Sequence, residues 1–141
     1  MGVDAIEGGC FCGAVRYRAS APPLVSMICH CQSCRRVSAA PAVAWVTFAA
    51  ANFAFLQGEP QSFHSSEPVR RTFCGACGAP LTYEHAERPG EIDVVTCGLD
   101  RPDDFPPTYH AWISDDLTWV RFGDGLPAYE RWKTSDRPDG S

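Results

Sequence analysis

The chain has 141 residues, of which 45% are hydrophobic and 11% aromatic, a size and composition sufficient for one domain with a single core. Its formal net charge is −5, from 12 basic and 17 acidic residues, which disfavours nucleic acid as a partner because such binding draws on many Lys and Arg contacts with phosphates. We therefore expect no nucleic-acid partner, and one domain over residues 1–133 followed by a polar tail over residues 134–141.

Short segments with strand-like composition predict a mainly β fold. The first, residues 14–19, places Val15 and Tyr17 on one face and two arginines on the other, which is the two-residue period of a half-buried strand. Later segments are also short, rich in β-branched and aromatic residues, and bounded by turn-forming residues. They are residues 42–48, 53–56, 69–73, 80–84, 91–97, 108–113 and 118–122. One brief helix is expected over residues 31–38, so we predict a β-rich single domain with little helix.

Cysteine is the most informative residue type, because seven of the eight cysteines fall into three tight groups. The groups are Cys10 and Cys12, then Cys29, Cys31 and Cys34, then Cys74 and Cys77. Residues 1–9 show no basic segment followed by an apolar run, and no stretch is long enough to cross a bilayer, so we expect a cytoplasmic protein without a membrane partner. Grouped thiols in a reducing compartment more often bind metal or do chemistry than form disulfides.

The two outer cysteine pairs predict a closed zinc site. Cys74 and Cys77 are separated by two residues in the glycine-rich turn FCGACGAP, which can present both sulfurs to one ion. Cys10 and Cys12, in GGCFCGAV, supply the two further ligands that a tetrahedral site needs. Such a zinc would join the N-terminal strand to the middle of the domain and contribute folding energy directly. The alternative is that Cys74 and Cys77 are small core residues.

The middle group has a different number of ligands. Its cysteines are Cys29, Cys31 and Cys34. Three protein ligands with one exchangeable position describe a catalytic zinc, whereas four closed ligands describe a structural one. The alternative is that His30, Cys97 or His110 supplies a fourth ligand and closes the site, and His30 is not assigned as a ligand.

Four segments resemble a known family over residues 8–132: GGCFCGAVRY, CHCQSCRR, FCGACGAPL and DGLPAYERW. They resemble the glutathione-dependent formaldehyde-activating enzyme family, also called the centromere-protein-V-like family. The resemblance implies an Mss4-like, zinc-bound arrangement of twisted sheets with two zinc ions. It implies a structural zinc on Cys10, Cys12, Cys74 and Cys77, and a catalytic zinc on Cys29, Cys31 and Cys34. Cys97 lies outside the shared pattern, and we expect it to be a buried small hydrophobic residue.

The resemblance also implies a reaction. The family's named activity adds the glutathione thiol to formaldehyde, giving S-hydroxymethylglutathione, and is classed as that of a carbon-sulfur lyase. An open zinc suits this chemistry, because a thiol in the fourth position loses its proton and is held near an aldehyde. Three thiolates leave the site with a net charge of about −1, which favours thiol capture over strong carbonyl activation. The alternative is a zinc-stabilised, non-catalytic binding module, because fold does not dictate function.

Two arginine pairs flank the cysteine groups. Arg35 and Arg36 follow the middle group, and Arg70 and Arg71 precede the last pair. Guanidinium groups bind carboxylates bidentately, so we predict Arg35 and Arg36 as contacts for a glutathione-like ligand. The alternative for both pairs is an exposed or strand-edge charge, or a charge that balances the zinc-thiolate site. Structural roles in packing or turns are expected for Trp45, Trp112, Trp119, Trp132, His64, His85, His110, Asp100 and Asp124.

Overall fold

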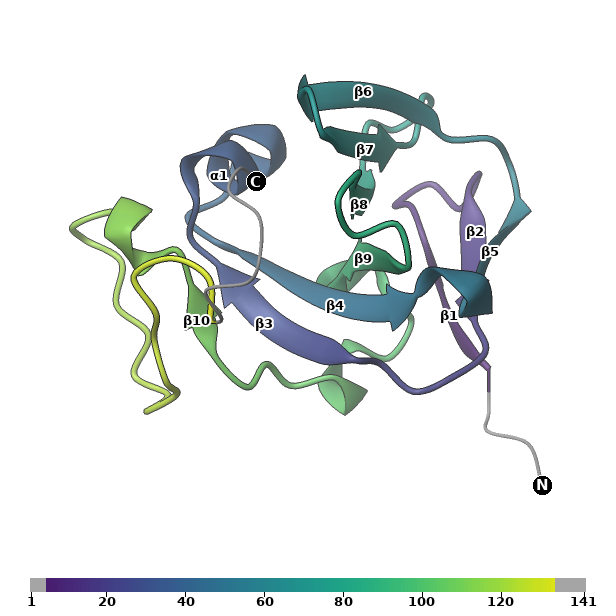
Figure 1. The fold of residues 1–141 in the computed structure, drawn as a ribbon. Helices are drawn as coiled ribbons and strands as arrows, with labels where there is room; N and C mark the ends of the chain where they lie inside the picture. The colour runs from purple at the N-terminus through teal and green to yellow at the C-terminus, as the bar shows by residue number, and fades with distance from the viewer. Residues whose placement is uncertain (1–4, 134–141) are drawn as a thin grey trace.

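The computed structural model describes residues 5–133, which form two β-sheets and one α-helix (Figure 1). The strands are β1 (Ile6–Gly9), β2 (Arg16–Ala19), β3 (Val25–Cys29), β4 (Val43–Ala49), β5 (Phe53–Gln57), β6 (Gln61–Ser66), β7 (Val69–Phe73), β8 (Pro80–His85), β9 (Glu91–Val95) and β10 (His110–Ala111). The helix is α1 (Gln32–Ser38), and short 3-10 turns cover Ala50–Asn52, Thr96–Gly98, Pro102–Asp104 and Ile113–Asp115. The mainly β class is therefore confirmed, whereas the predicted tail at 134–141 lies outside the described residues.

The larger sheet has seven strands in the order β10-β3-β4-β9-β8-β7-β6. All neighbours are antiparallel except β10, which pairs with β3 in parallel over two residues. Strand β4 lies between β3 and β9, and four consecutive residues from Trp45 to Phe48 are buried. This nearly continuous apolar run is what a central strand with both faces covered requires. No helix among the described residues has the length and apolar composition needed to span a bilayer.

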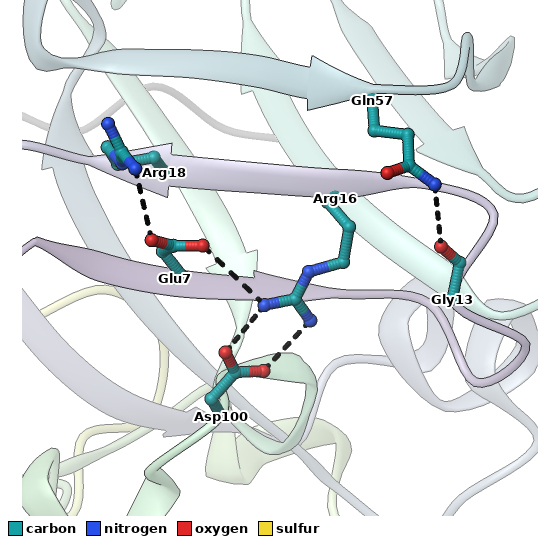
Figure 2. Close-up of polar contacts among 6 residues, drawn as sticks. All are labelled: Glu7, Gly13, Arg16, Arg18, Gln57 and Asp100. Carbon is teal, nitrogen blue, oxygen red and sulfur yellow. Dashed lines mark hydrogen bonds and ion pairs between the residues drawn. The ribbon is translucent and has the colours of Figure 1, made fainter.

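The smaller sheet, β1-β2-β5, is held to the larger one on its charged side as well as its apolar side. Tyr17 of β2 is 1% exposed and packs in the core, as the alternation predicted. On the solvent side Arg16 donates two hydrogen bonds to Asp100, at 2.9 and 2.5 Å, and Glu7 accepts from Arg18 at 3.2 Å (Figure 2). Asp100 follows the 3-10 turn after β9, so its pair with Arg16 connects the N-terminal hairpin to the end of β9, whereas the Arg18–Glu7 pair lies within the hairpin.

Two apolar clusters fill the interior, and each contains cysteines. One includes Val46, Phe48 and Leu81, with Cys74 buried in it and Cys10 and Cys77 packed against it. The other surrounds the middle cysteine group with bulky aromatic side chains. Its aromatic members are Trp45, Tyr83, Tyr109 and Trp112. Both cysteine groups therefore lie within or against hydrophobic core rather than on isolated loops.

Several predicted elements differ from the structure. Residues 118–122 form a turn and irregular chain rather than a strand. The segment pairs with no strand of the described residues, and its Trp119 is 69% exposed, so its alternating pattern does not correspond to a buried face. The segment 108–113 contributes only the two residues of β10. Cys97 is exposed in a 3-10 turn, so the prediction of a buried residue is wrong. The turn follows β9 directly, so Cys97 lies beyond the end of the strand and outside the sheet.

Candidate metal centres

Four cysteine sulfurs meet between two loops that are far apart in the sequence. Cys10 and Cys12 lie in the β1–β2 loop, and Cys74 and Cys77 lie in the β7–β8 loop. All four sulfurs are within 4.8 Å of one another. The Sγ atoms of Cys10 and Cys12 are 3.6 Å apart, and those of Cys12 and Cys74 are 3.8 Å apart. Sulfurs bound tetrahedrally to one zinc at about 2.3 Å are about 3.8 Å apart, so the arrangement fits a shared ion.

Backbone amides around this cluster favour thiolates. Val15 donates its N–H to the Cys10 sulfur at 3.2 Å, and Ala76 donates to the Cys74 sulfur at 3.3 Å. Backbone hydrogen bonds, first from Ala79, lower the pKa of Cys77 to about 6. Such N–H groups stabilise negative sulfur in the way that they stabilise other anions in turns. The loops thus place N–H donors on individual sulfurs, as metal-binding thiolates would require.

The second cluster is built from one continuous segment. Its sulfurs belong to Cys29, Cys31 and Cys34, and all three lie within 4.8 Å of one another. Cys29 ends β3, and Cys31 is the N-cap of α1, where its sulfur accepts the N–H of Cys34 at 3.2 Å. A cap requires a side-chain acceptor beside the first free amides of a helix, so the helix start itself fixes the direction of the Cys31 sulfur. The predicted helix, over residues 31–38, is confirmed with Cys31 as its cap.

The three middle thiols are almost completely buried, at 1%, 1% and 2% exposure. The pKa of Cys29 is raised, first by its hydrogen bonds to Cys31 and Cys34 and then by burial. Several thiolates cannot coexist in such a site without a compensating positive charge, because burial and mutual repulsion both disfavour the ionised form. A bound divalent cation supplies that charge, so the donor set fits a metal ion.

The three residues considered as a fourth ligand lie elsewhere. Within residues 5–133, the ligand atoms that gather at this cluster are the three sulfurs alone. The ring of His30 bonds to His110, with 2.9 Å between Nε2 and Nδ1, and His110 Nε2 lies 2.8 Å from a carboxylate oxygen of Asp124. Cys97 lines a cavity beside Cys10. The histidines instead link the β3–α1 junction through β10 to Asp124, which agrees with the structural role expected for His110.

One small cavity touches the three-cysteine cluster, and a larger one, which none of the three cysteines lines, shares Trp45 with the small one. The small one, of about 10 Å³, touches Cys29 and Cys34 and is walled by bulky side chains, Met27, Trp45, Tyr83, Asp93 and Trp132. The larger one, of about 430 Å³, lies between α1 and the β6–β7 pair, with Val37 on the helix side and Phe63 and Arg71 on the strand side. Figure 1 shows α1 and the β6–β7 pair projecting from the same side of β4. The cluster is thus bordered by aromatic walls, and room for a small molecule lies beyond Trp45 and Arg71, both of which line the larger cavity.

The arginines occupy different environments. Arg35 donates to the backbone oxygens of His30 at 3.3 Å and Asp115 at 3.0 Å, while Arg36 is exposed on α1, and neither lines the two cavities. Arg71 is 1% exposed and lies beside Cys34. The sequence prediction gives Arg71 no role distinct from that of Arg70. Arg71 lies two residues after the apolar Val69 and therefore on the same strand face, which is the signal in the sequence that indicates its burial.

The fold and the two cysteine clusters define a small β-protein with two candidate metal centres. The chain belongs to the glutathione-dependent formaldehyde-activating enzyme family, whose sequence profile matches residues 5–115. It is 27% identical over 124 residues to a Halomonas elongata protein named "Putative glutathione-dependent formaldehyde-activating enzyme", covering 82% of this chain and 79% of that protein. The fold is similar to the crystal structure of a Rhodobacter sphaeroides protein, with a TM-score of 0.57 and 22% identity over 67% of this chain and 87% of that chain.

Proposed function

We propose that the protein is a zinc-dependent carbon-sulfur lyase that adds the glutathione thiol to formaldehyde, or forms a related thiol-aldehyde adduct. The observation that carries this proposal is the buried trio of thiols, with no fourth protein ligand gathered beside it in residues 5–133. Membership of the family supports the choice of a thiol and an aldehyde as substrates. All eight cysteines are free thiols, which supports the proposal that the protein functions in a reducing, cytoplasmic compartment.

In the proposed reaction, the thiol loses its proton and its sulfur forms a bond to the aldehyde carbon. The electron pair of the carbonyl π bond moves to oxygen, which takes up one proton, so the thiol and the aldehyde give an S-hydroxymethyl product with no other reactant. A zinc ion, when bound, supplies the positive charge that deprotonates and holds the thiol. Holding both partners together removes much of the entropic barrier to a bimolecular step.

The residues of the chain then have distinct proposed roles. Cys29, Cys31 and Cys34 hold the catalytic ion, and the four cysteines of the β1–β2 and β7–β8 loops hold a structural one. Trp45 and Tyr83 exclude bulk water from the reacting sulfur, since both form walls of the adjoining cavity. The carboxylates of glutathione remain the proposed partners of Arg35 and Arg36. The exposed Arg36 is the better placed of the two, because Arg35 already donates to two backbone carbonyls.

Exchange between free and glutathione-bound formaldehyde, followed by NMR, tests the proposal. We expect exchange to be faster with the protein than with buffer, and the acceleration to disappear in Cys31→Ser. Serine is a good N-cap, so this substitution removes a sulfur ligand while keeping the start of α1. Cys97→Ser is the matched control, because Cys97 is exposed and belongs to neither cluster. Equal exchange rates with and without wild-type protein would leave the non-catalytic binding module as the better account.

A further inference from the structure

Arg71 is a charged residue in the interior of the domain. It lies on β7, is 1% exposed, and is the largest of the fully buried side chains among the described residues. Its guanidinium carbon is 5.0 Å from the centre of the Tyr83 ring and 6.0 Å from that of Trp45. Arginine is rarely buried to this extent unless another group balances its charge.

The expected balancing group, a carboxylate, is not beside it. None of the ion pairs among residues 5–133 includes Arg71. Its Nε donates to the neutral hydroxyl of Ser65 at 2.8 Å, and its Nη1 is buried without a hydrogen-bond partner. The remaining nitrogen, Nη2, lies 3.8 Å from the sulfur of Cys34. The nearest group that can carry negative charge is therefore a thiolate of the three-cysteine cluster.

We propose that Arg71 is the positioning residue and charge partner of the Cys29–Cys31–Cys34 site. Three thiolates and one divalent ion carry a net charge of about −1, and the guanidinium brings the buried assembly close to neutral. The N–H donated by Nη2 also withdraws electron density from the Cys34 sulfur and fixes its direction. Hydrogen bonds to metal ligands from surrounding groups tune both metal affinity and the reactivity of the site.

This role extends the proposed function, because the affinity of the three-cysteine site for zinc would then depend on a residue that need not touch the metal. The inference rests on the proposed metal site, but it does not require that the substrate be formaldehyde. The neighbouring Arg70 offers a matched comparison on the same strand. Arg70 is exposed and pairs with Glu84 at 3.2 Å, so its removal takes away the same charge without touching the cluster.

Metal release from the full chain tests the inference. Zinc-loaded wild type, Arg71→Met, Arg71→Lys and Arg70→Met are mixed with a chromophoric chelator, and the release of each zinc equivalent is followed. We expect one equivalent to leave Arg71→Met at least ~10-fold faster than wild type, because removal of partners of metal ligands typically costs 10- to 100-fold in affinity. The other equivalent is expected to be unchanged, and Arg70→Met is expected to behave as wild type. Equal release from Arg71→Met and Arg70→Met would overturn the inference.

Cobalt substitution supplies a second readout that does not depend on activity. The sulfur-to-cobalt charge-transfer bands are expected to shift in Arg71→Met and in Arg71→Lys, since a lysine ammonium cannot reproduce the planar fork that reaches both Ser65 and Cys34. If Arg71→Met does not fold, the Arg71→Lys spectrum decides, and bands identical to those of wild type would contradict the inference. A wild-type protein that binds a single ion, unaffected by Cys31→Ser, would instead refute the proposed metal site itself.

Discussion

The two cysteine clusters differ in how the chain assembles them. The four-cysteine cluster joins two loops separated by more than sixty residues, since Cys12 and Cys74 are 62 positions apart. The three-cysteine cluster comes from the six consecutive residues between Cys29 and Cys34, at the junction of β3 and α1. A metal in the first cluster therefore crosslinks distant parts of the fold, whereas a metal in the second constrains a junction that backbone hydrogen bonds already fix. We infer that the first serves stability and the second serves chemistry.

Burial and charge sharpen this difference. In the four-cysteine cluster Cys12 is exposed and the sulfurs accept backbone N–H groups. In the three-cysteine cluster all sulfurs are buried, and a buried arginine lies beside one of them. Four thiolates saturate a tetrahedral ion, while three leave it one position for a substrate. Ligand number and surroundings, rather than the mere presence of cysteine, therefore separate the proposed structural site from the proposed reactive one.

Cys77→Ser should have the largest effect on stability. Removing one ligand weakens the crosslink between the β1–β2 and β7–β8 loops, and the apparent free energy of structural zinc binding is on the order of 10–16 kcal/mol. We expect a loss on the order of several kcal/mol, a large share of the stability of a domain of this size. Thermal unfolding followed by circular dichroism measures it. Cys97→Ser should unfold like wild type. A Cys77→Ser protein of unchanged stability would contradict a crosslinking role for the four-cysteine cluster.

Cys31→Ser should reduce activity strongly and stability only modestly, whereas Cys77→Ser should mainly reduce stability. Activity should fall at least ~100-fold, because the loss of groups that merely support metal ligands already costs 10- to 100-fold. The free energy of unfolding should fall by less than in Cys77→Ser, since a serine hydroxyl can still cap α1 and no distant segments are released. Parallel thermal unfolding and NMR exchange assays on the two variants measure the contrast. Equal losses of stability in the two variants would show that the clusters are not specialised.

The smallest effect is expected at the surface pair between Arg16 and Asp100. The hydrogen bond from Arg16 lowers the pKa of Asp100 below its ordinary value of 3.8. A carboxyl with a lowered pKa stabilises the folded state above its unfolded pKa, and this contribution is lost as the pH falls through the folded value. Asp100→Asn should therefore cost less than ~1 kcal/mol at pH 7, because solvent screens the pair, and less still at an acidic pH below the lowered pKa of Asp100. Urea unfolding at both pH values checks it, and a larger cost at the lower pH would contradict the assignment.

Much of this organisation could be predicted from the sequence because it is local. The spacing of Cys74 and Cys77 in a glycine-rich turn, the alternation around Tyr17 and the start of α1 at Cys31 each depend on a few neighbouring residues. The gathering of cysteines into a group of four and a group of three followed from counting ligands. Metal occupancy, the Mss4-like arrangement and the individual site roles stay predictions.

Other features depended on contacts that no local pattern contains. Strand β6 is mostly polar and exposed, and it exists because β7 pairs with it, so its own composition gave no signal. Residues 118–122 have strand-like composition but meet no partner strand. Arg71 acquires its environment only when β7 passes beside α1. Tertiary contacts thus determine which segments become strands where composition and alternation alone are ambiguous.

The zinc content of the protein, purified without chelator, tests the central claim most directly. We predict two zinc ions per chain in the wild type. One should be removed readily by a chelator, while the other should be retained until the protein unfolds. Cys31→Ser should retain one ion. A wild-type chain with one tightly held zinc, or with the Cys29–Cys31–Cys34 thiols oxidised to a disulfide, would contradict the division into a structural site and an open one.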